Sequence, residues 1–327
     1  VQHSFGAINL EDISQPNCFK VLDELRETCD IPVWHDDAQG TACVTLAGLI
    51  NALKLVNKKL SEVRIVLLGA GASNTTIARL LMTDGADPAK IIMFDSQGSL
   101  HTGRKDIETD TRNYRKWELC QKTNPQGIKD MDTAIKGADV LIALSTPGPD
   151  TVKREWVRSM AEKAIVFACA NPVPEIWPYA AKEEGAYIVA TGRGDFPNQV
   201  NNSVCFPGIL KGALLVRSRK ITDGMAIRCA HSIADFAERR GISPENIIAT
   251  MEETEVFAVE AADVAMQAIA EDVARVPMTW DEVYQQAKAD IAASRSLVAD
   301  MQRLGHIKEP PQEMLEAALQ SAIEAVK

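Results

Sequence analysis

The stretch from residue 63 to residue 95 most limits the folds open to this chain. It begins VRIVLLGAGASNTTIARLLMTDG, an apolar β-rich run, a glycine-containing turn and an amphipathic helical segment that ends at Gly85. A second apolar run, KIIMFD, follows at residues 90–95. A strand, helix, strand unit of this kind places its two strands in parallel through a right-handed crossover. The chain is therefore expected to contain a parallel sheet covered by helices.

Three further buried strands are expected in the next hundred residues. They are ADVLIALST at 138–146, AIVFACANP at 164–172 and AYIVATG at 186–192, and helical segments separate them. This alternation predicts an α/β fold with a doubly wound parallel sheet, that is, a Rossmann-like domain. From Gly224 onward the pattern is almost wholly helical, with one apolar face on each helix.

The pattern predicts three parts of the chain. Residues 1–38, with a helix and the strand-like run IPVW, precede the doubly wound sheet. Residues 39–222 would form the Rossmann-like domain. Residues 223–327 would form a helical C-terminal region that packs back on the core.

Charge and cysteine usage narrow the class of partner and the compartment. The formal charge of -10 argues against nucleic acid or an anionic membrane as a partner, because both require a basic surface. The 7 cysteines are scattered without a Cys-x-x-Cys pair, which favours reduced thiols and a cytoplasmic location. The sequence has no apolar run of about 20 residues and no signal peptide at its start. A small-molecule or protein partner is therefore expected.

The glycine turn is a candidate nucleotide site. Gly69 permits a tight turn and Gly71 lets a pyrophosphate approach the backbone at the start of the following helix. The third glycine of the usual fingerprint is replaced by Asn74. Asp95 ends the next strand, where a carboxylate can bind a ribose hydroxyl. The alternative is a simple strand-to-helix turn without a ligand.

Asp95 also bears on the choice between NAD and NADP. A carboxylate repels a 2′-phosphate, so charge alone favours NAD. A nearby Arg104 or Lys105 could offset that preference. Either nucleotide therefore remains open.

Two acidic pairs stand at the ends of apolar runs. Glu11 and Asp12 follow AINL, and Asp36 and Asp37 follow IPVWH. Four converging carboxylates would raise one another's pKa, whereas a hard divalent ion such as Mg²⁺ or Mn²⁺ would stabilise them. Zinc is disfavoured because His35 is the single histidine beside them. The alternative is that these residues are helix caps or loop charges.

Two asparagine-rich stretches complete the candidate site. ACANPVPE places Asn171 at the carboxyl end of a strand, where ligands bind in open α/β sheets, and FPNQVNNSVCFPG places Asn201 and Asn202 between hydrophobic residues. Neutral amides can hydrogen-bond a substrate carboxylate or a nicotinamide without adding charge. The Asn-Pro pair is equally typical of a turn.

These motifs together resemble a known family. FGAINLEDI, IPVWHDDAQGTA, GAGAS, ANPVPE and TGRGDFPNQVNNSVCFPG are similar to segments of the malic enzymes, in particular the short bacterial type, in the same order over residues 5–215. The resemblance implies oxidative decarboxylation of (S)-malate to pyruvate and CO₂, with NAD or NADP and Mg²⁺ or Mn²⁺. It also implies a homodimer or a higher homo-oligomer. Under this resemblance, residues 1–38 are the remnant of an N-terminal substrate and metal domain, and residues 39–222 are the NAD(P)-binding domain.

The resemblance implies a role for each matching residue. Glu11, Asp12 and Asp37 would bind the metal, and Asp36 would orient the catalytic lysine. Asn171 and Asn202 would contact malate or the nicotinamide end of the cofactor. The expected cofactor contacts are completed by Thr41, Gly69, Ala70, Gly71, Ala72, Ser73 and Asp95.

One departure from the family concerns proton transfer. The family's catalytic lysine and tyrosine precede the first acidic motif, and no Lys or Tyr of this chain matches them. Because Val1 is not an initiator methionine, we expect an N-terminal part to precede it, and expect poor turnover without that part. The alternatives are another two-domain NAD(P) dehydrogenase that needs no metal, and a non-catalytic module that binds nucleotide and metal.

Overall fold

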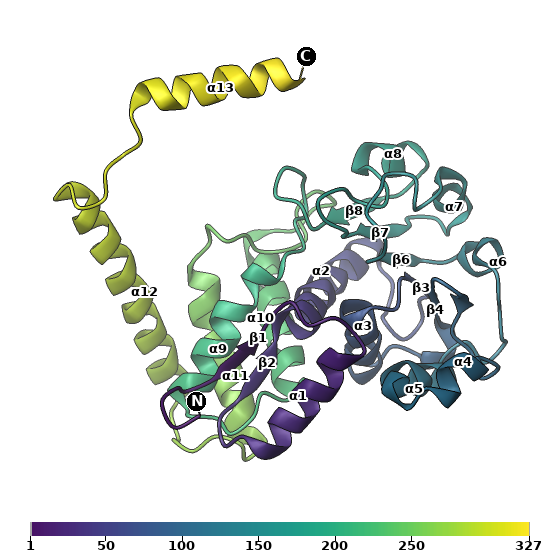
Figure 1. Ribbon diagram of the computed structural model, residues 1–327, viewed down its shortest axis with the longest axis horizontal. Coiled ribbons are helices and arrows are strands. Elements are labelled where there is room, and N and C mark those ends of the chain that lie inside the picture. The colour runs from purple at the N-terminus through teal and green to yellow at the C-terminus, as the bar shows by residue number, and fades with distance from the viewer. Residues whose placement is uncertain (1, 327) are drawn as a thin grey trace.

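Two sheets organise the chain, and the larger one confirms the predicted α/β fold (Figure 1). The computed structural model describes residues 2–326. The small sheet pairs β1 (Ile8–Leu10) with β2 (Val33–His35) in parallel. The large sheet has six strands in the order β5-β4-β3-β6-β7-β8. Their bounds are β3 Ile65–Leu68, β4 Ile91–Asp95, β5 Gly98–Ser99, β6 Val140–Ala143, β7 Ile165–Ala168 and β8 Ile188–Thr191.

The order of the large sheet follows from the crossover unit at residues 63–95. β3 lies in the middle, parallel to β4 on one side and to β6 on the other, so Ile65 faces both Ile91 and Val140. The two-residue β5 is the antiparallel edge strand beside β4. The chain therefore reverses its direction of strand addition at β3, and the carboxyl ends of β4, β3 and β6 share one edge of the sheet.

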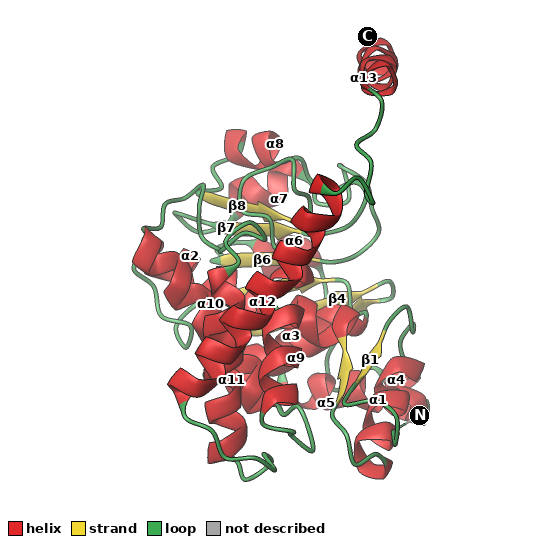
Figure 2. Cartoon of the chain, turned by 90° about the vertical axis from the view of Figure 1, so that its left-hand side faces the viewer, coloured by secondary structure: helices red, strands yellow, loops and turns green. Residues whose placement is uncertain are grey.

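Helices cover both faces of the sheet (Figure 2). Along β3, Ile65 and Leu67 point into one apolar cluster and Val66 into the other, as the two-residue period of a strand requires. The helices are α1 Asn17–Thr28, α2 Thr41–Val56, α3 Ala72–Thr83, α4 Lys105–Thr109, α5 Tyr114–Lys122, α6 Met131–Ile135, α7 Arg154–Ser159, α8 Pro178–Glu183, α9 Phe206–Leu215, α10 Asp223–Arg240, α11 Glu255–Ala270, α12 Trp280–Arg303 and α13 Gln312–Val326.

The helix α2 lies at the centre of the core. A π-helical turn, η1 (Asp36–Gly40), leads directly into it from the end of β2. The combined segment Asp36–Val56 is long and apolar enough to cross a membrane by composition, but 78% of its apolar window is buried inside the protein. It is therefore a core helix, which α3 and α10 pack against.

The C-terminal region differs in part from the expectation that it packs back on the core. α10 packs on α2 and α11, and α11 packs on α9 and α12. By contrast, α13 projects away from the body at the end of α12 (Figure 1), and its described side chains are all exposed. The apolar face of α13 therefore meets no surface within residues 2–326. The division at residues 38 and 222 stays a prediction, although Thr222 caps the start of α10.

Candidate functional site

The small sheet brings the two acidic pairs together. Leu10 of β1 lies opposite His35 of β2, so Glu11 and Asp12 leave one strand beside the point where Asp36 and Asp37 leave the other. The backbone N–H of Asp12, which has a φ of 57°, donates to Oδ2 of Asp37 at 2.8 Å. The sequence prediction of a shared acidic site therefore agrees with the arrangement of these strand ends.

Three of the four carboxylates suit a hard divalent ion. Glu11 and Asp12 are exposed and Asp37 is half-buried. Their oxygens are the ligand type that Mg²⁺ and Mn²⁺ prefer, and exposure leaves space for water and substrate oxygens. Within residues 2–326, these three side chains do not gather their ligand atoms within 4.8 Å of one another. The acidic site is thus an open set of oxygen donors.

Asp36 occupies a different environment from its neighbour. Its side chain is 3% exposed, and burial raises its pKa to about 6, with the Glu11 carboxylate adding to the rise. Trp34 Nε1 donates to Oδ1 at 3.2 Å, and Asn202 Nδ2 donates to Oδ2. A Cβ on Gly40 would lie 2.1 Å from Oδ1, so glycine is needed there. Asp36 is therefore held in place by two hydrogen bonds and close packing.

His35 begins the π-helical turn and is not arranged as a metal ligand. It is fully buried, and its Nδ1 accepts from the backbone N–H of Ala38 at 3.3 Å. Gln39 Oε1 accepts the backbone N–H of His35 at 3.0 Å. These contacts fix the turn that presents Asp36 and Asp37, and Thr41 stands at its end, where α2 begins.

A pocket of about 440 Å³ lies at the carboxyl ends of β3, β4 and β6. Gly69 has a φ of 96°, and a Cβ there would lie 2.2 Å from the carbonyl oxygen of Leu144. A Cβ on Gly71 would meet nothing within 4 Å, so the backbone is open toward the pocket. Gln15, Lys116 and Thr151 line the pocket together with residues from the three strand ends. The strand-end residues are Leu68, Gly69, Ala70, Gly71, Asp95, Ser96, Leu144, Ser145 and Thr146.

Asn74 explains the missing third glycine. The side chain is fully buried, and its Nδ2 donates to the carbonyl oxygens of Leu68 at 2.9 Å and Gly69 at 3.0 Å. These bonds hold the strand-to-helix turn from the helix side. An asparagine in the first turn of a helix is a residue type that often bonds to nearby backbone groups, and Asn74 does so here.

Ser73 connects the nucleotide turn to the acidic site. Its Oγ donates to the carbonyl oxygen of Asp37 at 2.8 Å. Ser73 and Ala72 do not line the pocket; they form the first turn of α3 beside η1. The predicted cofactor residues thus divide between the pocket itself and the contact between α3 and η1.

Asp95 is engaged by two cations. Arg104 binds both carboxylate oxygens, at 2.9 and 3.0 Å, and Lys116 Nζ lies 3.7 Å from Oδ2. Of the two cations expected to offset Asp95, Arg104 does so, whereas Lys105 pairs with Glu108 instead. Lys116 lies in the polar first turn of α5 and belongs to no motif, so the sequence gave no signal for it, although it lines the pocket.

The two predicted asparagines lie in different surroundings. Asn202 contacts Asp36, whereas Asn171 is exposed at the loop after β7, and its Nδ2 lies 3.0 Å from the place of a Cβ on Gly192. The end of ANPVPE supplies a further residue that the sequence reasoning gave no role. Glu175 is fully buried and accepts the backbone N–H groups of Ser145 at 2.7 Å and Ala170 at 3.0 Å.

Comparisons with known proteins agree with this arrangement. The family described as "Malic enzyme, NAD binding domain" matches residues 38–270. The "Bifunctional malic/malolactic enzyme" of Bacillus subtilis is 42% identical over 290 residues, which cover 88% of this chain and 68% of that protein. The "NAD-dependent malic enzyme" of Geobacillus stearothermophilus is 44% identical over 270 residues, covering 82% of this chain and 53% of that protein.

A solved structure covers the whole chain. The crystal structure of Entamoeba histolytica malic enzyme is 66% identical, with a TM-score of 0.97, and covers 100% of this chain and 67% of that one. The chain spans 53% to 68% of the length of the two curated relatives above. Family match, identity and fold together place this chain in the malic enzyme family.

Proposed function

We propose that this chain carries the nucleotide and divalent-metal sites of an enzyme that oxidatively decarboxylates (S)-malate to pyruvate and CO₂ with NAD or NADP. The observation that carries the proposal is the meeting of Glu11 and Asp12 with Asp36 and Asp37 at the ends of β1 and β2. The Ser73 contact to Asp37 joins this acidic site to the nucleotide turn. A dehydrogenase that needs no metal has no use for such an arrangement of carboxylates.

Glu11, Asp12 and Asp37 would hold Mg²⁺ or Mn²⁺ through carboxylate oxygens. The N–H of Asp12 fixes one oxygen of Asp37, and the Asn9 side-chain amide fixes Oε1 of Glu11 at 2.7 Å. When bound, the ion would act as a Lewis acid on the substrate carbonyl. It would also offset the repulsion between a dianionic substrate and a protein of formal charge -10.

Asp36 and Asn202 would position the reacting groups. Asp36 is anchored by Trp34 and Asn202, so it can accept a hydrogen bond from a donor in a fixed direction. Asn202 and the exposed Asn171 would present amides to malate or to the nicotinamide end of the cofactor. The proposal assigns the proton transfers to no lysine or tyrosine of this chain.

The pocket at the carboxyl ends of β3, β4 and β6 would receive the dinucleotide, which supplies the hydride acceptor. Gly69, Ala70 and Gly71 would lie against the pyrophosphate, with Ala72, Ser73 and Thr41 behind them. Asp95 would bind the adenosine ribose. The charge of Arg104 on Asp95 reduces its repulsion of a 2′-phosphate, which keeps NADP as well as NAD within the proposal.

The proposal extends to location and assembly. All 7 cysteines are free, which supports a cytoplasmic protein. The exposed apolar residues of α12 and α13 support a homodimer or a higher homo-oligomer, because such a face needs a partner. Neither nucleic acid nor a membrane is proposed as a partner.

Metal binding tests the proposal. Titration with Mn²⁺, followed by electron paramagnetic resonance, should detect a binding site in the parent protein. Asp37→Asn should lower the Mn²⁺ affinity by at least about tenfold, because removal of even a supporting group of a metal site costs that much. Asp300→Asn, on the exposed part of α12, is the matched control and should bind Mn²⁺ like the parent protein. Equal Mn²⁺ affinity of the parent and Asp37→Asn would contradict the proposed ligand set.

A second function is a non-catalytic module that binds nucleotide and metal. Such a module would use the same nucleotide pocket and the same acidic pairs, because binding alone requires both. Addition of (S)-malate to the protein with Mn²⁺ and NAD⁺ or NADP⁺ separates the two functions. Malate-dependent reduction of the nucleotide that a chelator abolishes supports the enzyme, and binding without reduction supports the module.

A further inference from the structure

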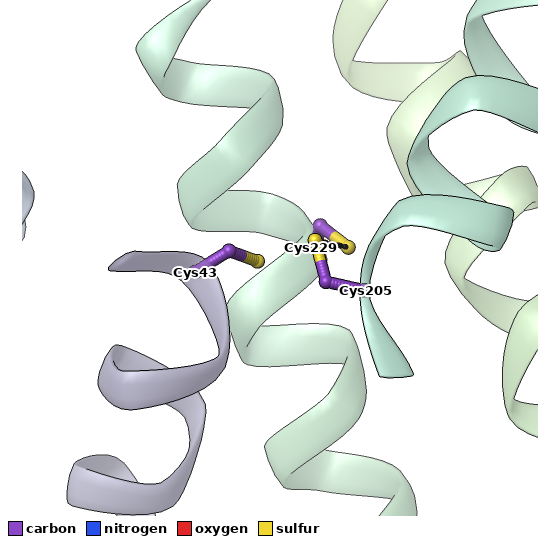
Figure 3. Close-up of side chains that lie close together, drawn as sticks. All are labelled: Cys43, Cys205 and Cys229. Atoms are coloured by element: carbon purple, nitrogen blue, oxygen red, sulfur yellow. Dashed lines mark hydrogen bonds between the residues drawn. The ribbon is translucent and has the colours of Figure 1, made fainter. Parts of the chain in front are cut away.

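Three cysteine side chains meet inside the helical layer, apart from the nucleotide pocket and the acidic pairs. Cys43 comes from α2, Cys205 from the residue before α9 and Cys229 from α10 (Figure 3). All three are fully buried, and their Sγ atoms lie within 4.8 Å of one another. Over residues 2–326, no other three His, Cys, Asp or Glu side chains place their ligand atoms so close together.

The spacing of the sulfur atoms fits metal coordination. Cys205 Sγ and Cys229 Sγ are 3.8 Å apart. In a tetrahedral zinc site with Zn–S bonds of about 2.3 Å, two thiolate sulfurs are separated by about 3.8 Å. A disulfide would require about 2.05 Å, so the two thiols are not joined. The pair already has the separation that a shared Zn²⁺ would impose.

A buried carboxyl group lies against these thiols. Glu260, on α11, has no exposed surface, and Cys229 Sγ donates to its Oε2 at 3.7 Å. Its other oxygen, Oε1, has no hydrogen-bond partner among the described residues. Gly208 gives it room, because a Cβ there would lie 2.2 Å from Oε2. Burial raises the pKa of Glu260 well above its usual value, so the carboxyl group keeps its proton until a cation displaces it, and the unpartnered oxygen is left without a bond that a cation would supply.

We propose that Cys43, Cys205 and Cys229 form a buried structural Zn²⁺ site, with the Glu260 carboxylate, which contacts Cys229 alone, turning in to complete it as the fourth ligand. Thiolates select zinc over Mg²⁺ or Mn²⁺, and four such ligands give zinc the same net charge as a Cys₄ site. Burial holds the pKa of each thiol well above its usual value, so the thiols keep their protons until a metal displaces them. The site is distinct from the acidic one and does not depend on the proposed reaction.

A zinc ion at this position would connect four segments of the chain. Cys43 is in the first turn of α2, close to Thr41, and Cys205 directly follows η4 (Asn202–Val204). Cys229 and Glu260 belong to the two helices that pack behind them. The ion would therefore fix the helix starts that present Thr41 and Asn202 without touching substrate.

Zinc content is the first test. The purified protein, dialysed against a mild chelator that strips the acidic site, should retain about one zinc per chain by plasma mass spectrometry. Cys229→Ala should lower that content to less than about a fifth, because structural sites need their full ligand set. Cys120→Ala, another fully buried cysteine outside the cluster, is the matched control and should keep its zinc.

Cobalt substitution keeps the test independent of how the variants fold. The parent protein produced with Co²⁺ in place of zinc should show intense near-ultraviolet thiolate-to-cobalt charge-transfer absorption, which an oxygen-ligated ion does not give. Glu260→Gln should keep that absorption and shift the visible cobalt bands, because one oxygen ligand loses its charge. Parent protein with less than about a tenth of an equivalent of zinc and without the charge-transfer absorption would overturn the proposal.

Discussion

Asp36 and Asp37 are neighbours in the sequence but differ in their exposure to solvent. Asp37 is half-buried and its Oδ2 accepts the backbone N–H of Asp12, whereas Asp36 is 3% exposed and is bound by Trp34 and Asn202. Both residues belong to the helical turn η1, where successive side chains leave the axis in different directions. Asp37 can therefore bind a metal, while Asp36 supports the chemistry from a buried position.

Lys116 is the residue on which we expect the cofactor preference to depend. It lines the pocket and lies 3.7 Å from Asp95 Oδ2, where a 2′-phosphate would approach. We predict that Lys116→Ala lowers NADP affinity by about tenfold, the loss of one charged hydrogen bond, with little effect on NAD. Fluorescence titration with NADPH and NADH measures both affinities.

Lys105→Ala is the control for Lys116, because Lys105 is exposed and pairs with Glu108. It should leave both affinities unchanged. An equal loss for NADH and NADPH in Lys116→Ala would show that Lys116 supports the pocket rather than reading the phosphate.

At the scale of elements, Glu175 holds two strand ends in register beside the pocket. Its oxygens accept the N–H groups of Ser145, after β6, and Ala170, after β7. We predict that Glu175→Gln lowers the free energy of unfolding by about 1 to 3 kcal/mol, because the new amide NH₂ faces a backbone donor. Urea unfolding measures the change, and nucleotide affinity should fall with it.

Glu183→Gln provides the comparison for this substitution. Glu183 is an exposed partner of Arg154, so its replacement should change the unfolding free energy by less than about 1 kcal/mol. If the two variants lose the same amount, Glu175 is not the anchor that its contacts indicate.

A second contact between elements is sensitive to pH. His231 of α10 contacts Asp84 Oδ1, at the end of α3, at 2.8 Å, and this hydrogen bond raises the pKa of His231. The stabilisation is therefore fully present below the unfolded pKa of about 6.5 and is lost as pH rises through the higher folded pKa. Because His231 is partly exposed, we expect this contact to contribute about 0.5 kcal/mol to the free energy of unfolding.

Thermal unfolding of the parent protein and of His231→Gln measures this contribution. The measurements run from about pH 5 to about pH 9, a range that spans the histidine pKa. The difference in Tm should be largest at acidic pH and vanish at alkaline pH. A difference that grows with pH would mean that the neutral imidazole, not the imidazolium, is the stabilising form.

The sequence predicted the elements that repeat a clear period and missed those without one. β3, β4 and α3 follow from the alternation and helical spacing of residues 63–95. The short helices α4 and α6 have 5 residues each, too few to show a period. Contacts such as Asn202 to Asp36 join distant segments, so only the fold brings them together. The motif resemblance assigned roles that spacing alone left open, and those roles stay predictions.

At the scale of the whole molecule, a projecting arm formed by the exposed second half of α12 (residues 292–303) and by α13 finds no partner among residues 2–326. Leu315, Leu319 and Ile323 recur at helical spacing on α13, and all are exposed. An apolar stripe of this kind is stable in water when a second surface covers it. We predict that Leu319→Glu shifts the protein toward smaller species, as measured by light scattering after size exclusion.

Gln320→Glu adds the same charge one residue away, off the Leu315, Leu319 and Ile323 stripe. It should leave the molar mass unchanged. A parent protein that is monomeric at all concentrations would contradict the role given to the arm.

The hydrogen bond from Ser73 to the carbonyl of Asp37 has a thermodynamic consequence. Ser73 lies in the first turn of the helix that would meet the pyrophosphate, and Asp37 belongs to the proposed metal ligands. The nucleotide and the metal would therefore be joined by a short path of covalent bonds and one hydrogen bond. Any order that a bound nucleotide imposed on α3 would pass through this bond to the turn that presents Asp37. By linkage, a nucleotide that strengthens metal binding must itself be bound more tightly by the same factor when the metal is present.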